Sequence, residues 1–335
     1  MNTDQTHAAA QTGKPTLPLL SICIPTYNRS GFLRQTLDSV LVTLSRVSAK
    51  CELLVCDNAS PDDTQAVLEE FRSRWPALKI FRNPENIGEL NFYTAIQHAT
   101  GKYVWLLGDD DLVEPGFLPA VINRLAEDPE LVVCNHSIHS VDFSIKYHHA
   151  FHSLHAPESF SDRNDVLAEF GAGLSFISAG IVSRERITAI PLEIFERFSA
   201  HGLSFFTAVC SSLDRACRVA FIREPLLRYR GGNAVASDAT WELIFVEGVG
   251  VALKHLAAIG YSSGAIRKAK GRAVRQYLIP RISEFKKRGK STSALMSRAA
   301  LVFSVSPLFH LLAVPLSKLP GKVFPFLRWL RRRAS

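Results

Sequence analysis

The sequence lacks the short motifs that mark several large enzyme classes. No G-x-G-x-x-G follows the first strand-like run, and this absence disfavours a dinucleotide cofactor. The chain has no G-x-x-x-x-G-K-[ST], which excludes P-loop phosphate binding. It has neither H-E-x-x-H nor a paired C-x-x-C with which to bind zinc. The remaining possibility is a site assembled from the ends of separate strands.

Signals for secretion and disulfide bonding are missing as well. The polar first 16 residues contain no apolar signal core, and we expect residues 1–17 to form a flexible leader. Six cysteines occur without C-x-x-C spacing, several of them inside apolar runs. We interpret them as buried free thiols of a protein in a reducing cytoplasm.

Acidic residues are scarce at the end of the chain. From Gly264 onward there are 17 Lys and Arg residues and a single acid, Glu284. The preceding part holds 22 basic and 30 acidic residues, so it is acidic although the whole chain carries +8. This distribution argues against a nucleic-acid partner for the body and predicts an anionic partner for the tail.

The first third of the chain alternates between strand-like and helix-like segments. Strands are expected at 19–25, 51–57, 78–82 and 103–107, with helices between them. A further helix (117–127) and strand (131–134) follow. Alternation of this kind with short connections predicts an α/β fold with a mostly parallel sheet flanked by helices on both faces.

Polar side chains follow three of these strands. They are Thr26, Asn28 and Arg29 after the first, Asp57 after the second, and Asp109–Asp111 after the fourth. Parallel strands end at one edge of a sheet, where open α/β sheets bind ligands. Adjacent carboxylates repel each other unless they share a cation, and hard oxygen ligands suit Mg²⁺ or Mn²⁺ with a diphosphate. The alternative is a solvated acidic turn.

The middle of the chain is less regular. Strands are expected at 176–182, 219–222 and 226–230, with a helix at 203–213 and a loop from Gly231. Six histidines occur between residues 136 and 155, but no pair has helical i,i+4 spacing with a partnering carboxylate. A polar loop or irregular hairpin is therefore favoured over a metal site.

Several of these segments together resemble the family 2 glycosyltransferases with the GT-A fold. The motifs that carry the resemblance are Ser21–Arg29, Val55–Ser60, Asn86–Gly88 and Gly101–Asp111, in the family's order and spacing. A further match at Glu224–Arg230, with the Gly231-Gly232-Asn233 that follows it, is similar to the abequosyltransferase-like branch, which acts on bacterial surface polysaccharide. The resemblance implies a GT-A domain at 18–240, with a nucleotide-binding half at 18–125 and an acceptor half at 126–240.

The resemblance also implies roles for individual residues. It implies inverting transfer of a sugar from a nucleotide-diphosphate donor to a lipid-linked saccharide acceptor. Asp109 to Asp111 would form the D-x-D element, in which Asp109 and Asp111 hold the metal. The nucleotide-binding residues implied by position are Pro25, Thr26, Asn28, Arg29, Asp57, Asn86, Gly88, Asp109 and Asp110.

An inverting transfer needs a general base, and the family's usual residues are absent. Many relatives carry a Glu-Asp pair at the start of the helix before the Glu224–Arg230 match, where this chain has Ser199-Ala200-His201-Gly202-Leu203. His201 is a candidate substitute, because imidazole is a competent base near neutral pH. It could equally be a polar residue at a helix start. Asp214 and Glu196 are weaker candidates.

Residues 241–335 are expected to be a helical C-terminal region with a membrane-associating tail. Ala299 to Ser317 is uncharged and near the length of a membrane span, but Pro307, Pro315 and His310 interrupt it. Basic and aromatic residues at 318–333 suit an anionic membrane surface. We favour attachment in the membrane plane over a span or over packing on the body. The expected location is therefore peripheral, at the cytoplasmic face of the inner (plasma) membrane.

Two other functions remain open at this point. One is a sugar nucleotidyltransferase on a similar sheet. Such enzymes carry a Gly-rich loop with Lys or Arg after the first strand, and Ile24–Arg29 does not match this pattern. The other is a catalytically silent relative that tethers a membrane complex, for which the missing Glu-Asp pair is the argument.

Overall fold

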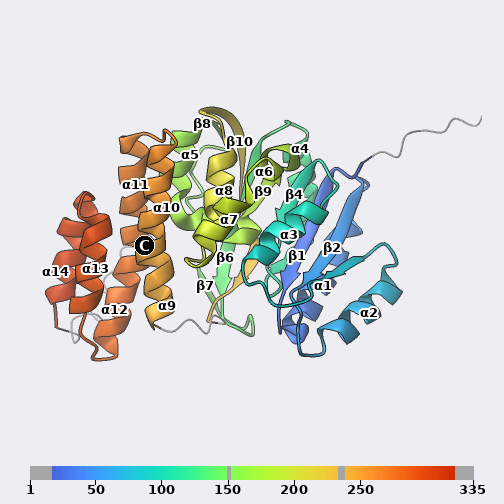
Figure 1. Cartoon of the computed structure of the whole chain (residues 1–335), viewed down its shortest axis with the longest axis horizontal. Coiled ribbons are helices and arrows are strands. Elements are labelled where there is room, and N and C mark those ends of the chain that lie inside the picture. The colour runs from blue at the N-terminus through green and yellow to red at the C-terminus, as the bar shows by residue number, and fades with distance from the viewer. Residues whose placement is uncertain (1–16, 149–151, 233–237, 321–335) are drawn as a thin grey trace, which may run out of the picture.

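The computed structural model describes residues 17–148, 152–232 and 238–320 (Figure 1). Residues 1–16 of the expected leader and residues 321–335 of the expected tail lie outside the described residues. A single twisted sheet occupies the centre of the molecule, with strand order β3-β2-β1-β4-β9-β6-β10-β5, while β7 pairs with β6 and β8 with β10. The strands are β1 (Leu20–Thr26), β2 (Cys51–Asp57), β3 (Lys79–Arg82), β4 (Tyr103–Leu106), β5 (Leu112–Val113), β6 (Leu131–His139), β7 (Lys146–His148), β8 (Ser159–Asp162), β9 (Gly180–Ser183) and β10 (Ala216–Arg230).

The first four strands form the parallel half of the sheet that the sequence predicts. β1 pairs in parallel with both β2 and β4, and β2 pairs in parallel with β3. β9 runs antiparallel between β4 and β6, and β10 is parallel to β6. The α/β fold class is confirmed, with a mixed second half.

Helices cover both faces of the sheet because alternate residues of the central strands face opposite sides. In β4, Tyr103 and Trp105 belong to the apolar cluster that includes α1, α2 and α4, whereas Val104 and Leu106 belong to the cluster on the other face. A strand buried on both faces reads as a continuous apolar run in the sequence. The helices of the body are α1 (Ser30–Leu44), α2 (Thr64–Arg74), α3 (Leu90–His98), α4 (Phe117–Leu125), α5 (Arg163–Phe170), α6 (Arg184–Thr188), α7 (Leu192–Ser199) and α8 (Ser204–Ser212).

Three local predictions for the middle of the chain were wrong. Residues 176–182 are not one strand: Ile177–Ala179 is a 3₁₀ turn, and β9 starts only at Gly180. The Ser178 carbonyl accepts a hydrogen bond from the Trp105 indole, so β4, the strand that pairs with β9, holds this turn in place. The two strands expected at 219–222 and 226–230 are one strand, β10, whose register shifts between Ile222 and Leu227, where Pro225 cannot donate to a ladder.

The described part of the histidine-rich segment is an irregular hairpin, as expected, but three of its histidines, including His148 of β7, lie in strands. His136 and His139 belong to β6, which is longer than predicted, and β7 returns antiparallel to it. Among the described residues, no group of His, Cys, Asp or Glu could by itself hold a metal ion. All six cysteines are free thiols, and every one except the half-buried Cys51 is buried.

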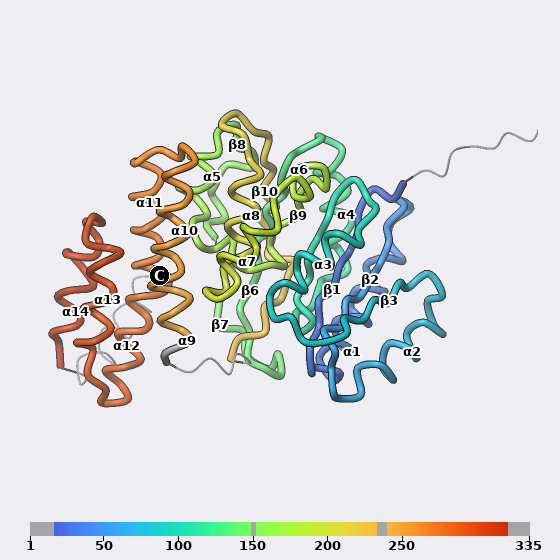
Figure 2. Tube along the Cα trace, in the orientation of Figure 1, coloured from blue at the N-terminus to red at the C-terminus, as the bar shows by residue number. Residues whose placement is uncertain are grey.

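The C-terminal helices lie at the end of the molecule opposite α2 and β3 (Figure 2). Residues of α10 and α11 share one apolar cluster with α5 and α8, so this region packs on the body. Its elements are α9 (Asp238–Glu242), α10 (Val249–Ala258), α11 (Ser263–Ala273), α12 (Ile279–Lys287), α13 (Ser293–Phe303) and α14 (Val314–Lys318), with π-helical turns at Leu243–Gly248, Val274–Leu278 and Phe309–Ala313.

The apolar run 299–317 is divided rather than continuous. It contributes the end of α13, a break at Ser304–Ser306, and the segment from Phe309 to α14. Within the described part of the chain, none of the helices combines the length and the apolar character that crossing a membrane requires.

Candidate active site

A cavity of about 550 Å³ lies at the carboxyl edge of the parallel strands. Its walls are formed by the turn after β1, the loop before α3, the start of α8, and the turn after β4 that carries Asp109–Asp111, which we call the acidic turn. The lining residues are Pro25, Thr26, Tyr27, Arg29, Asn58, Gly88, Glu89, Asn91, Phe92, Gly108, Asp109, Asp110, Asp111, Ser175, Phe176, Ile177, Gly202, Phe205, Phe206 and Tyr229. The convergence of strand ends that the sequence predicts is thus present.

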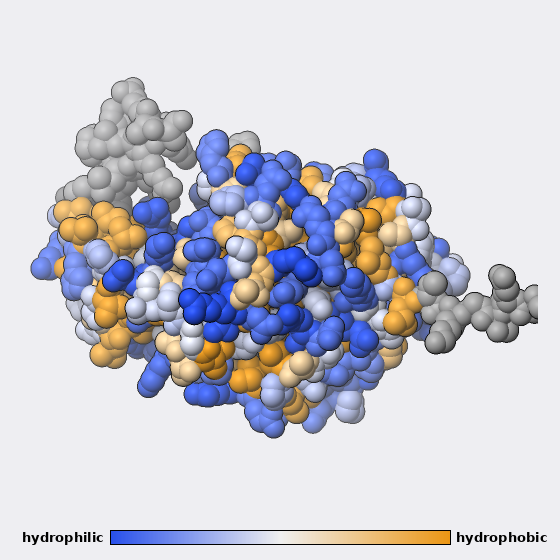
Figure 3. Space-filling model, turned by 90° about the horizontal axis from the view of Figure 1, so that it is seen from above, coloured by the Kyte–Doolittle hydropathy of each residue, from blue (hydrophilic) through white to orange (hydrophobic). Residues whose placement is uncertain are grey.

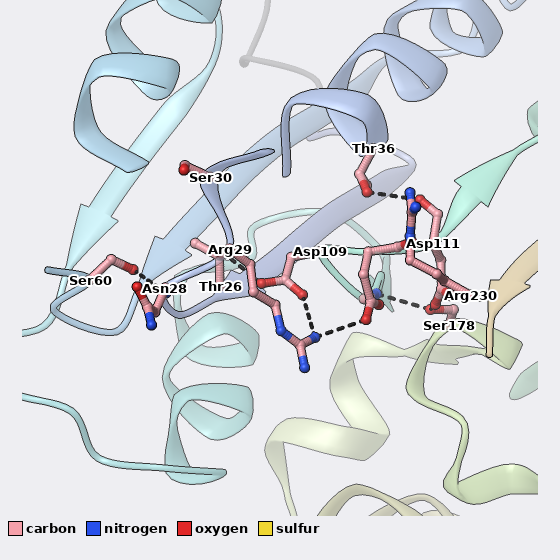
Figure 4. Close-up of polar contacts among 12 residues, drawn as sticks. Thr26, Asn28, Arg29, Ser30, Thr36, Ser60, Asp109, Asp111, Ser178 and Arg230 are labelled. Atoms are coloured by element: carbon pink, nitrogen blue, oxygen red, sulfur yellow. Dashed lines mark hydrogen bonds and ion pairs between the residues drawn. The ribbon is translucent and has the colours of Figure 1, made fainter. Parts of the chain in front are cut away.

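Thr26, Arg29 and Asp109 connect the ends of β1 and β4 (Figure 4). The Thr26 hydroxyl donates to Asp109 Oδ2 at 2.7 Å, and Arg29 Nη1 lies 3.1 Å from Asp109 Oδ1. The same Arg29 nitrogen lies 2.9 Å from Asp110 Oδ2. The Arg29 guanidinium is therefore a cation that Asp109 and Asp110 share.

Asp111 points in another direction from its two neighbours. It is 1% exposed, and its Oδ2 accepts a 2.6 Å bond from the Ser178 hydroxyl. The same hydroxyl accepts from the Gly108 amide at 2.9 Å, which ties both ends of the turn to one side chain. A Cβ at Gly108 would lie 2.8 Å from Asp111 Oδ2, so only glycine leaves room for this arrangement.

Arg230, at the end of β10, holds the acidic turn from behind. Its Nε donates to the Asp110 carbonyl at 2.7 Å and its Nη2 to Gln35 at 2.8 Å, while its guanidinium lies 4.4 Å from the ring centre of Phe32. Arg230 is 2% exposed. A buried cation thus partly offsets the three adjacent carboxylates.

Burial raises the pKa of the acidic turn. The pKa of Asp109 rises to about 6, because burial outweighs the neighbouring Arg29 charge and the bond from Thr26. Burial and the charge of Asp110 raise the pKa of Asp111 well above its ordinary value. Burial alone would lower the pKa of Arg29, but the nearby carboxylates raise it on balance. The turn therefore favours an added positive charge.

The donor atoms fit a divalent cation in part. Asp109 and Asp110 present hard carboxylate oxygens to the cavity and already share one positive group, Arg29. Mg²⁺ and Mn²⁺ need only one or two protein carboxylates when substrate phosphates supply further ligands. The predicted pair was Asp109 and Asp111; in this structure Asp110, not Asp111, shares a cation with Asp109, because Asp111 is bonded to Ser178.

The other residues implied for nucleotide binding divide into two groups. Pro25, Thr26, Arg29, Gly88, Asp109 and Asp110 line the cavity, whereas Asn28, Asp57 and Asn86 lie outside its lining. Asp57 is fully buried, and its carboxylate accepts from the Ser60 amide at 3.0 Å, from Gln65 at 2.6 Å and from Arg82. In this structure Asp57 therefore holds the loop beside the cavity.

Asn28 and Asn86 also shape the walls rather than face the cavity. Asn28 adopts a positive φ of 54°, and its backbone N–H donates to the Ser60 hydroxyl oxygen at 2.9 Å. Asn86 Oδ1 accepts bonds from Gly88 N at 2.9 Å and from Asn58 Nδ2 at 2.8 Å. Asn58, buried and lining the cavity, is the residue of this group that the sequence analysis did not single out.

The loop before α3 brings an unexpected carboxylate to the cavity, where it meets the start of α8. His201, the predicted base, does not line it, and the wall there is formed by Gly202. Glu89, which directly precedes α3, does line the cavity and accepts bonds from the Ser204 hydroxyl at 2.7 Å and the Ser204 amide at 3.3 Å. Burial raises the pKa of Glu89 to about 7, although these bonds lower it.

Glu89, Ser178 and Arg230 were the main omissions of the sequence analysis. Glu89 follows the Asn86–Gly88 motif directly, so its position beside a matched segment was an available signal. Arg230 ends the Glu224–Arg230 match, but its partners Asp111 and Asp110 lie 119 and 120 residues earlier in the chain. A local sequence pattern does not show contacts over such separations. Ser178 had no local signal at all, since its segment was read as a strand.

The comparison with protein families and with curated proteins agrees with this geometry. Residues 21–182 match the model for glycosyl transferase family 2. Abequosyltransferase RfbV of Salmonella typhimurium is 28% identical over 229 residues, which covers 64% of this chain and 67% of that protein. Chondroitin synthase of Escherichia coli is 30% identical over 116 residues, 34% of this chain but only 16% of the synthase.

Solved structures show the same fold at low sequence identity. TarS 1-349 of S. aureus, in complex with UDP, has a TM-score of 0.52 and 13% identity, and the match covers 87% of this chain and 91% of that one. The mannosyltransferase PcManGT of Pyrobaculum calidifontis, in complex with GDP-Man and Mn²⁺, has a TM-score of 0.52 and 14% identity over 90% and 85% of the two chains. Residues 21–182 thus match glycosyl transferase family 2, and the chain is similar to an abequosyltransferase and has the GT-A fold.

Proposed function

We propose that this chain is an inverting glycosyltransferase that moves a sugar from a nucleotide-diphosphate sugar to a saccharide acceptor in bacterial surface polysaccharide synthesis. The observation that carries the proposal is the cavity in which Thr26, Arg29 and Asp109 meet at the carboxyl edge of the sheet. The abequosyltransferase relative supports the polysaccharide assignment. The family match favours this function over a sugar nucleotidyltransferase.

The acidic turn gives the cavity a polarity suited to a diphosphate donor. In the proposed complex, Asp109 and Asp110 hold Mg²⁺ or Mn²⁺, and the ion offsets the negative charge that develops on the departing nucleoside diphosphate. Arg29 then becomes free to contact a phosphate oxygen, because a guanidinium binds phosphate as readily as carboxylate. The neighbouring structures with UDP and with GDP-Man and Mn²⁺ support this class of donor and cofactor.

The proposed acceptor is lipid-linked, and the C-terminal region carries features that suit a membrane surface. Arg267 and Lys268 of α11 and Arg275 of the π-helical turn that follows it line a second cavity of about 360 Å³ together with Ser306–Leu308. The adjacent apolar side chains Leu301 and Leu311 are 87% and 70% exposed. Figure 3 shows hydrophobic residues gathered on the end of the molecule that carries α13 and α14.

Exposed leucines beside basic side chains favour shallow binding to anionic lipid. We therefore propose peripheral attachment at the cytoplasmic face of the inner membrane. Sedimentation with phosphatidylcholine vesicles, with and without phosphatidylglycerol, tests the attachment. Binding that needs the anionic lipid and falls in Leu301→Ser/Leu311→Ser supports it, and equal recovery in the supernatant under all conditions contradicts it.

Calorimetry with UDP, GDP, CDP and dTDP, with and without Mn²⁺, tests the donor site. We expect one nucleotide to bind in a metal-dependent way, and Asp109→Asn to lose this binding. Glu127→Gln is the matched control, because Glu127 is an exposed acid in a surface ion pair with Arg124. If no nucleotide binds under any condition, the catalytically silent tether replaces the enzyme as the explanation.

A further inference from the structure

Glu89 differs from the other acidic side chains of the cavity in having no cation beside it. Asp109 and Asp110 are ion-paired with Arg29, and Asp111 is bonded to Ser178 and to the Arg230 amide. For Glu89, the structure records two partners within the part of the chain that it describes, and both are groups of Ser204. Glu89 is therefore an acid of the cavity for which, among the described residues, the structure records hydrogen bonds but no ion pair.

The local backbone holds this carboxylate at the cavity wall. Glu89 lies between Gly88, which has a positive φ of 59°, and the first residue of α3. On the facing side, Gly202 has a positive φ of 65°, and a Cβ placed there would lie 3.5 Å from Glu89 Oε1 and 3.1 Å from Ile244. Gly202 thus keeps open the space in which the carboxylate meets the start of α8.

We propose that Glu89 is the general base of the transfer and that Ser204 positions it. The inference rests on the proposed function, since a base is needed only if an acceptor hydroxyl attacks. Glu89 lines the same cavity as Asp109 and Asp110, and it shares its part of the wall with Gly202 and the start of α8. An acceptor hydroxyl bound in this cavity, between that wall and the acidic turn, can reach both the donor sugar and the Glu89 carboxylate.

The step balances without any further reactant. As the acceptor oxygen bonds to the anomeric carbon, its proton passes to Glu89. The bond from that carbon to the β-phosphate oxygen breaks, and the nucleoside diphosphate leaves with the electron pair. Attack from the side opposite the leaving group inverts the anomeric centre. The proton on Glu89 is then lost to solvent.

The environment of Glu89 suits this task. A base works best when its pKa is close to the working pH, and burial places the pKa of Glu89 at about 7. The other titratable or charged residues that line the cavity are Tyr27, Arg29, Asp109, Asp110, Asp111 and Tyr229. His201 lies next to Gly202, but its Nδ1 is buried without a hydrogen-bond partner among the described residues, and it is outside the lining.

The test compares Glu89→Gln with wild type in a transfer assay, using the nucleotide sugar whose nucleotide binds in calorimetry and a saccharide acceptor. Gln keeps an acceptor for Ser204 but cannot take a proton. We expect kcat to fall by about 10²- to 10⁴-fold with little change in KM for the donor or in nucleotide affinity. Glu85→Gln, which alters an exposed acid of the same loop, is the matched control and should keep wild-type kcat.

The pH profile separates a base from a structural residue. Wild-type kcat should rise with pH through about 7, and this limb should be absent in Glu89→Gln. Ser204→Ala removes a hydrogen bond that lowers the pKa of Glu89, so the limb should move to higher pH. His201→Gln should leave the limb in place.

The two proposals fail in different ways. If wild type neither binds a nucleotide nor transfers a sugar, the proposed function fails. If wild type transfers and Glu89→Gln keeps its kcat and its pH limb, Glu89 is not the base and the inference is overturned. If His201→Gln removes the limb instead, the inference is likewise overturned in favour of His201.

Discussion

The Thr26 hydroxyl donates a 2.7 Å hydrogen bond to Asp109 Oδ2 and so joins the turn after β1 to the acidic turn after β4. Both side chains are buried, 3% and 5% exposed, and come from strands that are neighbours in the sheet. The bond favours the ionised form of Asp109, which burial otherwise disfavours. It therefore links the geometry of the site to its charge.

Thr26→Val tests this link, because valine keeps the shape of threonine without the hydroxyl. The variant leaves a buried carboxylate oxygen without one partner, so we expect a loss of about 1–3 kcal/mol in the free energy of unfolding at pH 8. Mn²⁺-dependent nucleotide binding should weaken as well. Thr26→Ser retains the hydroxyl and should stay close to wild type. Equal stability of the valine and serine variants would contradict the role of the bond.

Arg29 competes with a metal ion for Asp109 and Asp110. Its removal by Arg29→Gln takes away the cation that the two carboxylates share, so the attraction of the turn for a divalent ion increases. We expect tighter Mn²⁺ binding without nucleotide in calorimetry at pH 8, where protons compete least.

The matched control for this change is Arg34→Gln. Arg34 lies in α1, which begins directly after Arg29, and forms an exposed ion pair with Glu70. Its loss should leave Mn²⁺ affinity unchanged. Weaker Mn²⁺ binding in Arg29→Gln than in wild type would show that Arg29 does not occupy the cation position.

Glu89 makes the stability of the protein depend on pH. Its pKa is raised in the folded chain, to about 7 from an ordinary value of 4.5, so its favourable contribution is complete at low pH and is lost as pH rises through 7. Glutamine does not ionise and avoids this loss. The free energy of unfolding of Glu89→Gln relative to wild type should therefore increase by about 3 kcal/mol between pH 4 and pH 8.

Urea denaturation at several pH values measures this difference. Glu85→Gln, which changes an exposed acid of the same loop, serves again as the matched control. A relative stability of Glu89→Gln that is constant from pH 4 to pH 8 would mean that Glu89 titrates normally in the folded protein.

Arg230 fixes the acidic turn to α1 and to the loop at 141–143. Arg230→Met keeps an apolar side chain of similar length but loses the bonds to the Asp110 carbonyl, to Gln35 and to the Val141 carbonyl, as well as the contacts over Phe32 and Phe143. Removing one partner of a buried charged network typically costs about 3–5 kcal/mol. We expect a loss of this size in urea denaturation, with weaker nucleotide binding.

Arg218→Met is the control on the same strand. Arg218 is 66% exposed and pairs with Asp128 at the surface, where such pairs contribute at most about 1 kcal/mol. If both substitutions cost equally little, the network around Arg230 does not hold the turn.

The nucleotide-binding half could be predicted closely because its signals are local. Each strand from β1 to β4 is a short apolar run that ends in polar residues, and the parallel arrangement follows from the alternation with helices. Pro25, Thr26, Arg29 and Asp109 could be placed at one edge from this alone. Asp57 was placed at the same edge, but its burial under Gln65 and Arg82 could not be read from the strand pattern.

The acceptor side of the cavity was predicted less well. Its elements are short, and its register is fixed by bonds between distant segments, such as Trp105 to the Ser178 carbonyl. A strand was therefore predicted where a 3₁₀ turn occurs. His201 was chosen as the base because it precedes the helix at which relatives carry their carboxylates, and the sequence offers no way to see that another segment reaches that helix.

The sequence by itself determined the parallel half of the sheet, the meeting of its polar strand ends and the family that residues 21–182 match, because burial patterns and turn residues act over a few neighbouring positions. The tertiary structure decided which groups pair within the site. Glu89 and Ser204 are 115 residues apart, and Arg29 and Asp109 are 80 apart. Such pairs form only when the packed sheet and helices bring them together, since the hydrogen bonds and charges involved act over a few ångströms.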